Sequence, residues 1–277
     1  MSTLDRAREA MTAELSAAFV DRDRTRVEAA ALWLRATGMP LVDLYETLFD
    51  AITCNVPEYS TTPGEHLERY QVQELMRHLI ARLREPARGP ARGDVALVVA
   101  GERRHVFGIP PLAHVLEDAG YRAVNAPGLT LDDLETVVDG LDEPVGAVIA
   151  LNDPALVPRA RKVVAAIRAR HPRCRVVVVG HAAAAVPDLA GATGAHAQGQ
   201  RIRDVLAIIQ AAANPLSPRE VAVLSAVARG MSNPDAGQHL GVAAATVKTH
   251  LDRVYAKLGT SDRTATVALA MRRGWID

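Results

Sequence analysis

Residues 216–259 read LSPREVAVLSAVARGMSNPDAGQHLGVAAATVKTHLDRVYAKLG, and their pattern predicts three helices in the C-terminal part of the chain. Ser217, Pro218 and Glu220 are typical of a helix start. A hydroxyl side chain caps the first turn, proline tolerates the first helical position, and glutamate three residues after the cap bonds back to it. Gly230 ends this helix. Ser232 then starts a second, shorter helix.

A third helix begins near Val242, after a short glycine turn, and has one apolar and one basic face. Its apolar stripe recurs at helical spacing and consists of Val247, Leu251, Val254 and Leu258. The side chains that fall largely outside the stripe are Lys248, His250, Arg253 and Lys257. Two helices joined in this way, the second basic on its free face, are typical of the helix-turn-helix, whose second helix enters the major groove of DNA.

The motifs L-S-P-R-E-x-x-V-L, G-x-S-N, L-G-V and T-V-K-x-H-L-x-x-V-Y-x-K-L-G, followed by R-T, closely resemble the LuxR/NarL-type helix-turn-helix family. The resemblance implies a transcriptional regulator that binds double-stranded DNA. It implies base-edge contacts for Lys248 and Thr249, with Asp252 able to accept a hydrogen bond from cytosine N4. The residues implied to lie nearer phosphates are Thr246, Arg253 and Lys257.

Two positions depart from the family pattern, and the charge of the segment is modest. Gly237 stands where the family usually has Ala, and Ala243 stands where Ser or Thr often caps the third helix. Residues 214–277 hold eight Arg and Lys against five Asp and Glu, a net charge of +3. A homodimer or higher homo-oligomer would multiply the phosphate contacts. The resemblance places the dimer contact in a fourth helix at residues 263–273.

The composition of the whole chain predicts a soluble, cytoplasmic protein. Its 277 residues have a formal net charge of +0, and no apolar run approaches the length of a membrane span. The polar start MSTLDRAREAM lacks the apolar core of a signal peptide. Cys54 and Cys174 lie far apart in sequence, which favours neither a disulfide framework nor a metal site.

The chain divides by pattern into three predicted domains: residues 1–84, 94–213 and 214–277. Four amphipathic helices make the first a helical bundle, and the Pro-, Gly- and Arg-rich residues 85–93 form a linker. In the second, short apolar runs alternate with helices, which predicts a parallel sheet of flavodoxin-like strand order 2-1-3-4-5. The expected strands are 95–100, 122–125, 147–150, 175–179 and 195–197. The fold class is thus multi-domain α and α/β, ending in an all-α helix-turn-helix.

A flavodoxin-like sheet binds ligands in the crevice beyond strands 1 and 3, and His105 lies in the loop after strand 1. A helical bundle followed by such a domain is similar to the cobalamin-binding module of methionine synthases and cobalamin-dependent photoreceptor repressors. His105-x-x-Gly108 keeps half of that family's D-x-H-x-x-G motif. The resemblance implies cobalamin, or a related tetrapyrrole, with His105 as the lower axial ligand to cobalt.

Further residues are implied by the same resemblance. Glu65-His66 resembles the motif with which the bundle covers the upper corrin face, and Gly180-His181 follows strand 4 where the family has Gly-Gly. Positions 149–152 hold no Ser or Thr to bond the buried nucleotide tail. These departures leave open a second interpretation, in which a degenerate domain binds no ligand and serves dimerisation or protein interaction.

Two other functions are disfavoured by the residues. A phosphoacceptor receiver domain has the same fold, but its chemistry needs an acidic pair after strand 1. Here Glu102 stands beside Arg103 and Arg104, which do not favour a divalent ion. An enzyme is not expected either, because no segment is left to build a substrate barrel or a zinc site.

Overall fold

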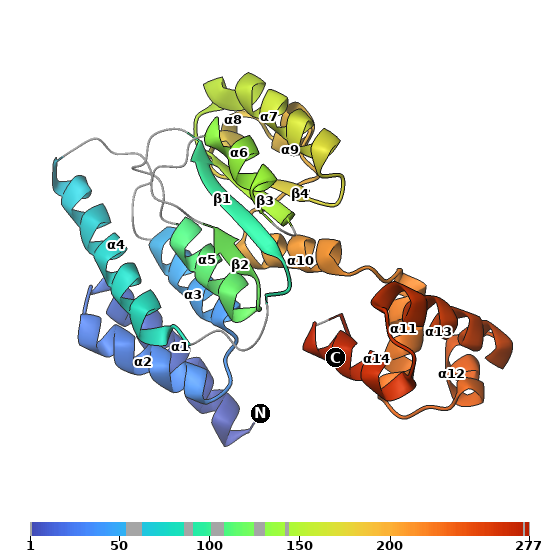
Figure 1. Ribbon diagram of the computed structural model, residues 1–277. Coiled ribbons are helices and arrows are strands. Elements are labelled where there is room, and N and C mark those ends of the chain that lie inside the picture. The colour runs from blue at the N-terminus through green and yellow to red at the C-terminus, as the bar shows by residue number, and fades with distance from the viewer. Residues whose placement is uncertain are drawn as a thin grey trace. The chain divides into compact units, whose positions relative to one another are not determined.

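The computed structural model describes residues 2–53, 63–85, 91–100, 108–124, 131–141, 144–273 and 275–276. The chain forms two compact units, Met1–Ala207 and Ile208–Asp277. The first unit contains both the helical bundle and the parallel sheet, and the second contains the C-terminal helices (Figure 1). The predicted boundaries of three domains stay a prediction.

The N-terminal bundle consists of α1 (Thr3–Val20), α2 (Arg24–Ala36), α3 (Leu41–Thr53) and α4 (Pro63–Leu83). Ser2 caps α1 in a reciprocal capping box with Asp5, and Asp23 caps α2 by accepting two backbone N–H groups. The core of the bundle is built from large side chains at helical spacing: Leu15, Phe19, Leu34, Leu44, Leu48 and Leu79. This confirms the predicted bundle.

The sheet has five parallel strands in the order β2-β1-β3-β4-β5, as predicted. The strands are β1 (Asp94–Ala100), β2 (Arg122–Val124), β3 (Pro144–Leu151), β4 (Arg175–Val179) and β5 (Ala197–Gln198). Apart from a register shift near its start, the β1–β3 pairing runs to Ala100 opposite Leu151. The loops after these two strands therefore leave the same edge of the sheet, where the strand order reverses.

Helices cover both faces of the sheet, because alternate residues along each buried strand point to opposite sides. One core joins alternate residues of β1, β3 and β4 to α6 (Asp133–Asp139), α7 (Val157–Arg170), α8 (Ala182–Ala185) and α9 (Leu189–Thr193). On the other side, α5 (Ile109–Asp118) packs against β1 and β2, and bundle helices α3 and α4 pack against α5 (Figure 1). The bundle and the sheet thus share one unit through α5.

Small elements differ from the sequence-based prediction. The sequence pattern predicts one helix over residues 154–170, whereas the structure has a short 3₁₀ turn (Pro154–Leu156) followed by α7. Helices α8 and α9 were not predicted, because segments of four and five residues are too short to display a period. Strand β5 comprises only Ala197–Gln198 and begins where the predicted strand ended.

The second unit holds α11 (Pro218–Ala228), α12 (Asn233–Leu240), α13 (Ala244–Leu258) and α14 (Arg263–Arg272). Helix α10 (Ile202–Ala213) starts in the first unit and ends in the second. The apolar stripe predicted for the third helix is buried in the core, with Val247, Leu251 and Val254 almost inaccessible to solvent. The predicted fold class is confirmed. Among the described residues, none of the helices combines the length and the hydropathy that a membrane span requires.

Candidate functional site

Helices α12 and α13 approach closely at a glycine turn. Ser232 caps α12 in a capping box with Asp235. Gly241 ends α12 in the left-handed conformation at φ 67°, and the Val242 N–H donates to the Gly237 carbonyl at 2.9 Å. A Cβ atom on Gly237 would lie 2.7 Å from the Val242 oxygen. The absence of a side chain at residue 237 therefore lets the turn pack directly on α12.

The free face of α13 carries the side chains predicted to meet DNA. All six of them are exposed: Thr246, Lys248, Thr249, Asp252, Arg253 and Lys257. The Thr249 hydroxyl donates to the Ala245 carbonyl at 3.0 Å, so its oxygen still has acceptor capacity. Lys248 and Arg253 have no hydrogen-bond or ion-pair partner among the described residues. These two cations are thus available to an external anion.

Lys257 differs from the other two cations because it has a partner inside its own unit. Its ammonium nitrogen lies 2.6 Å from a carboxylate oxygen of Glu220, whose side chain is only 5% exposed. Burial opposes the charge of Glu220, but Lys257 and the cap residue Ser217 together hold the pKa of this carboxyl below its ordinary value. The pair joins α13 to the start of α11, a role that the sequence did not reveal.

The N-terminus of α13 has no side-chain cap, whereas side-chain hydrogen bonds hold the start of α14. Ala243 occupies the N-cap position with extended backbone and offers no side-chain hydrogen bond. The Arg263 guanidinium donates to the Asn233 side chain at 3.1 Å and to the Met231 carbonyl. Arg263 thus joins the start of α14 to the start of α12 and the residue before its cap, and the R-T motif in the sequence was the signal for this residue.

At the carboxyl edge of the sheet, Asn152 links the ends of β3 and β4. Its side-chain oxygen accepts the His181 N–H at 3.3 Å. Gly180 has φ 109°, and a Cβ atom there would lie 2.7 Å from both the Asn152 side-chain oxygen and the Leu151 carbonyl. Gly180 therefore has a structural reason to be glycine, independent of any ligand.

The structure describes only part of the predicted cobalamin site. His105 lies outside the described residues. Glu65 and His66 fall in the first turn of α4, but their side chains lie outside the described part. Gly108 is the N-cap residue of α5, where no side chain bonds the first turn. No group of three His, Cys, Asp or Glu suited to a metal ion occurs among the residues that the structure describes.

A buried polar pair joins the bundle to the α/β part of the first unit. The Tyr45 hydroxyl of α3 lies 2.7 Å from Nδ1 of His114 on α5, and both residues are at most 3% exposed. Burial, followed by the charges of Arg84 and Arg35, lowers the pKa of His114 to about 4. His114 is therefore neutral near pH 7, and the pair fixes how α3 packs on α5.

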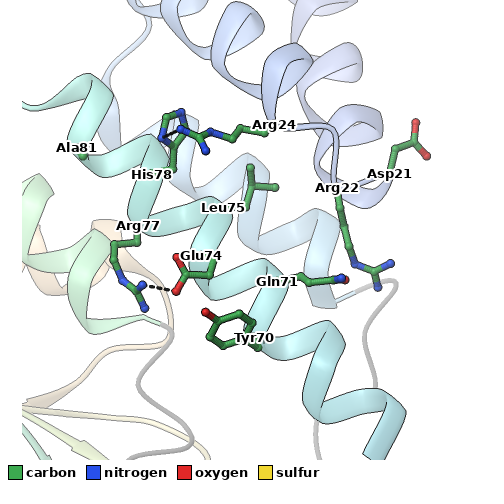
Figure 2. Close-up of a pocket in the computed structure, with 10 residues that line it drawn as sticks. All are labelled: Asp21, Arg22, Arg24, Tyr70, Gln71, Glu74, Leu75, Arg77, His78 and Ala81. Atoms are coloured by element: carbon green, nitrogen blue, oxygen red, sulfur yellow. Dashed lines mark hydrogen bonds and ion pairs between the residues drawn. The ribbon is translucent and has the colours of Figure 1, made fainter.

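A separate pocket of about 760 Å³ lies between the α1–α2 turn and α4 (Figure 2). Arg24 donates to Nδ1 of His78 at 2.7 Å, and since guanidinium only donates, Nε2 of His78 carries the proton shared with Glu28 at 2.8 Å. The pocket lining mixes both charge signs, with Asp21 and Glu74 beside three arginines. No predicted site residue is among the described residues that line it.

Comparison with known proteins identifies the C-terminal unit. The GerE family model, described as bacterial regulatory proteins of the luxR family, matches residues 214–270. The probable transcriptional regulatory protein NarL of Mycobacterium tuberculosis (strain ATCC 25618 / H37Rv) is 53% identical over 62 residues, 22% of this chain and 29% of that protein. The uncharacterized transcriptional regulatory protein YxjL of Bacillus subtilis (strain 168) is 42% identical over 62 residues, 22% of this chain and 28% of that protein. The match thus spans less than a third of these relatives.

Two solved structures are similar over a longer part of the chain. A novel cobalamin-binding protein from Desulfitobacterium hafniense DCB-2 has a TM-score of 0.40 and 17% identity, covering 73% of this chain and 98% of that one. The monomethylamine corrinoid protein of Methanosarcina barkeri has a TM-score of 0.47 and 12% identity, covering 72% and 98%. Neither likeness assigns a ligand to this chain.

The helix geometry described above and the family match cover the same residues. Two capped helices, a glycine turn and a third helix with an exposed basic face fall within the segment that the family model matches. The chain therefore carries, at residues 214–270, a helix-turn-helix domain of the LuxR family of bacterial regulatory proteins.

Proposed function

We propose that this protein is a transcriptional regulator that binds double-stranded DNA through α13. The observation that carries the proposal is the exposed basic face of α13 within a LuxR-family domain. In the proposed complex, Lys248 and Thr249 meet base edges and Asp252 accepts from cytosine N4, while Thr246 and Arg253 lie nearer phosphates. Lys257 reaches a phosphate only in competition with Glu220, its partner at 2.6 Å.

Selection from a random duplex library with the full chain tests this proposal. We expect enrichment of a recurrent motif, and replacement of Lys248 by Ala should weaken binding to it by about tenfold or more, as expected for a base-reading side chain. Lys162→Ala is the matched control, since Lys162 is an exposed lysine on α7 of the other unit. Failure to enrich any motif, or equal behaviour of the two variants, contradicts the proposal.

We further propose that two copies of the chain act together on a two-fold symmetric operator. The LuxR/NarL resemblance implies a dimer contact in α14, where the Met271 side chain is 49% exposed although it is apolar. Two helix-turn-helix domains bound side by side would double the phosphate contacts of a segment whose net charge is only +3. Sedimentation of the full chain with and without a selected duplex should give a dimer on DNA, and Met271→Asp should reduce it to a monomer.

For the first unit we propose a regulatory role, with two candidate modes of action. The first is binding of a cobalamin or related tetrapyrrole between bundle and sheet, supported by the reversal of strand order between β1 and β3 and by the motif His105-x-x-Gly108. The second is a ligand-independent body used for dimerisation or protein interaction. The contact of Asn152 with Gly180 and His181 favours the second.

The described residues do not fit the buried nucleotide tail of a cobalamin. The tail would need a hydroxyl after β3, where this chain has Asn152, whose oxygen is already engaged by the His181 N–H. It would also need space at the second residue after β4, where the family has Gly and this chain has the imidazole of His181. A tetrapyrrole without such a tail does not meet these two obstacles.

Visible absorbance of the purified full chain distinguishes the two candidates. The protein is mixed with hydroxocobalamin, adenosylcobalamin or haem in the dark, freed of unbound ligand, and measured before and after illumination. The sensing candidate requires a retained chromophore whose spectrum changes in His105→Ala. Absence of a chromophore with every probe, from a protein that still binds its selected duplex, leaves the ligand-independent candidate.

A further inference from the structure

Three carboxylates on one face of α3 meet two arginines at the start of α10. Asp43, Glu46 and Asp50 are spaced i, i+3 and i+7, so they lie on the same side of the helix. Arg203 bonds Asp43 at 3.2 Å and also pairs with Glu46, while Arg201 bonds Asp50 at 3.3 Å. The members of this cluster come from segments about 150 residues apart in sequence.

Glu46 is the centre of the cluster and acts as a cap for α10. It is only 4% exposed, although it carries a carboxylate. One of its oxygens accepts the backbone N–H of Arg203 at 3.1 Å, and the other bonds the guanidinium of the same residue. The first-turn N–H groups of a helix have no partner within the helix. Glu46 therefore satisfies one of them from a different part of the fold.

The same helix α3 is bonded to α5. Tyr45, the residue before Glu46, forms the buried hydrogen bond to His114. One turn further along α3, the Phe49 ring lies 4.0 Å from where a Cβ of Gly108, the N-cap residue of α5, would be. Helix α3 thus holds the start of α10 on one side and α5 on another.

We propose that α3 couples the packing of the first unit to the DNA-binding unit. In this proposal Glu46 sets the conformation of the first turn of α10, the helix that leads from the first unit into the DNA-binding unit. Helix α10 continues to Ala213, and α11 is capped at Ser217. A movement of α3 relative to α5 would be passed to α10 through Glu46 and Arg203. The inference rests on the proposed binding of DNA but requires no ligand in the first unit.

The substitution Glu46→Gln tests the coupling with little change in shape. It removes the charge that holds the Arg203 guanidinium and keeps one acceptor oxygen. The matched control is Asp94→Asn, because Asp94 is equally buried and pairs with the arginine Arg122 on β2 rather than with α10. Arg203→Gln breaks the same contact from the other side, so a folding failure of one variant does not end the test.

Two readouts on the full chain separate coupling from mere stability. Glu46→Gln keeps one acceptor oxygen, which cannot serve both the backbone N–H and the guanidinium of Arg203. Hydrogen exchange of the first-turn amides of α10 should therefore be about fivefold faster in Glu46→Gln and unchanged in the control. Affinity for the selected duplex should change by about fivefold or more in Glu46→Gln and Arg203→Gln, the range of a typical coupling between sites. The control should stay within about twofold of the wild type.

The outcomes are distinguishable. Faster exchange in α10 together with unchanged duplex affinity overturns the inference, because Glu46 then stabilises the fold only. An equal affinity change in Asp94→Asn also overturns it, since any buried carboxylate would then have the same effect. A wild-type chain that binds no duplex refutes the proposed function instead, whatever the variants do.

Discussion

Replacing Ala243 by Ser adds a cap to the recognition helix where the structure has none. Ala243 has φ −67° and ψ 148°, the extended conformation that an N-cap residue needs, and its side chain is exposed. The Thr246 N–H already donates to the Ala243 carbonyl at 2.9 Å. A serine hydroxyl at residue 243 adds a side-chain acceptor for the first-turn N–H groups of α13, at a backbone conformation that already suits a cap. The change from Ala to Ser at an N-cap stabilises by about 1 kcal/mol, within a range of about 0.5–2 kcal/mol.

The C-terminal unit offers its own reporter for this change. The chain has two tryptophans, and Trp275 packs against the core of the C-terminal unit. In a Trp33→Phe background, the fluorescence of Trp275 therefore follows the unfolding of that unit in urea. With a slope of about 1–2 kcal/mol per molar urea for a small unit, the midpoint should rise by roughly 0.5–1 M in Ala243→Ser.

A serine inside the same helix provides the control. Ala256 is exposed in the interior of α13, where serine is a weaker helix former than alanine. Ala256→Ser should therefore lower the midpoint slightly, while Ala243→Ser raises it. If both serines lower the midpoint, Ala243 is not the N-cap residue, and the start of α13 is not where the structure places it.

Three further predictions follow from single contacts. Gly237→Ala should lower the urea midpoint of the C-terminal unit, because a Cβ atom would lie 2.7 Å from the Val242 oxygen. Overpacking costs about 1–3 kcal/mol against a helix-propensity gain of about 1 kcal/mol, a net loss of up to about 2 kcal/mol. A higher midpoint would contradict this. Lys257→Met should lower the stability of that unit by about 1–3 kcal/mol, since it leaves Glu220 buried without its cation; unchanged stability would make Lys257 a DNA contact only. The free energy of unfolding of the first unit, measured by hydrogen exchange of α5, should be greatest above about pH 6.5 and fall by an amount on the order of 3 kcal/mol towards pH 4. The reason is that His114 has a pKa of about 4 in the folded state but an ordinary pKa of about 6.5 when unfolded, so between these values only the unfolded state takes up a proton. His114→Asn should remove that part of the pH dependence.

The sequence predicted the elements whose signals are local. Ser217 and Ser232 cap their helices as the spacing of Glu220 and Asp235 indicates, so the helix starts in the C-terminal unit follow from a few residues each. The parallel pairing of the strands follows from their alternation with helices, because parallel strands need crossovers. The order 2-1-3-4-5 was the flavodoxin-like choice for five such strands, and the structure has this order. The fold class needed no long-range information beyond this.

The contacts that the sequence did not reveal join distant segments. The spacing of Asp43, Glu46 and Asp50 indicates a charged face on α3, but nothing in it names Arg203 as the partner. The pair of Tyr45 and His114 is hidden for the same reason. The sequence alone predicts an unpaired cation at Lys257, because its partner Glu220 lies 37 residues earlier, on another helix. The sequence pattern shows which residues share one face of a helix, whereas only the packed structure shows which residues contact that face.

Binding of a selected duplex by the full chain, measured as a function of salt concentration, shows whether α13 contacts DNA. If α13 lies in the major groove, the logarithm of the association constant should fall linearly with the logarithm of salt concentration. Arg253→Ala should reduce that slope by about 1 for each subunit bound and weaken all sequences alike, whereas Lys248→Ala should weaken the selected sequence most. Binding that is insensitive to salt, or a slope that neither substitution changes, would contradict the assignment of α13 as the DNA-reading helix.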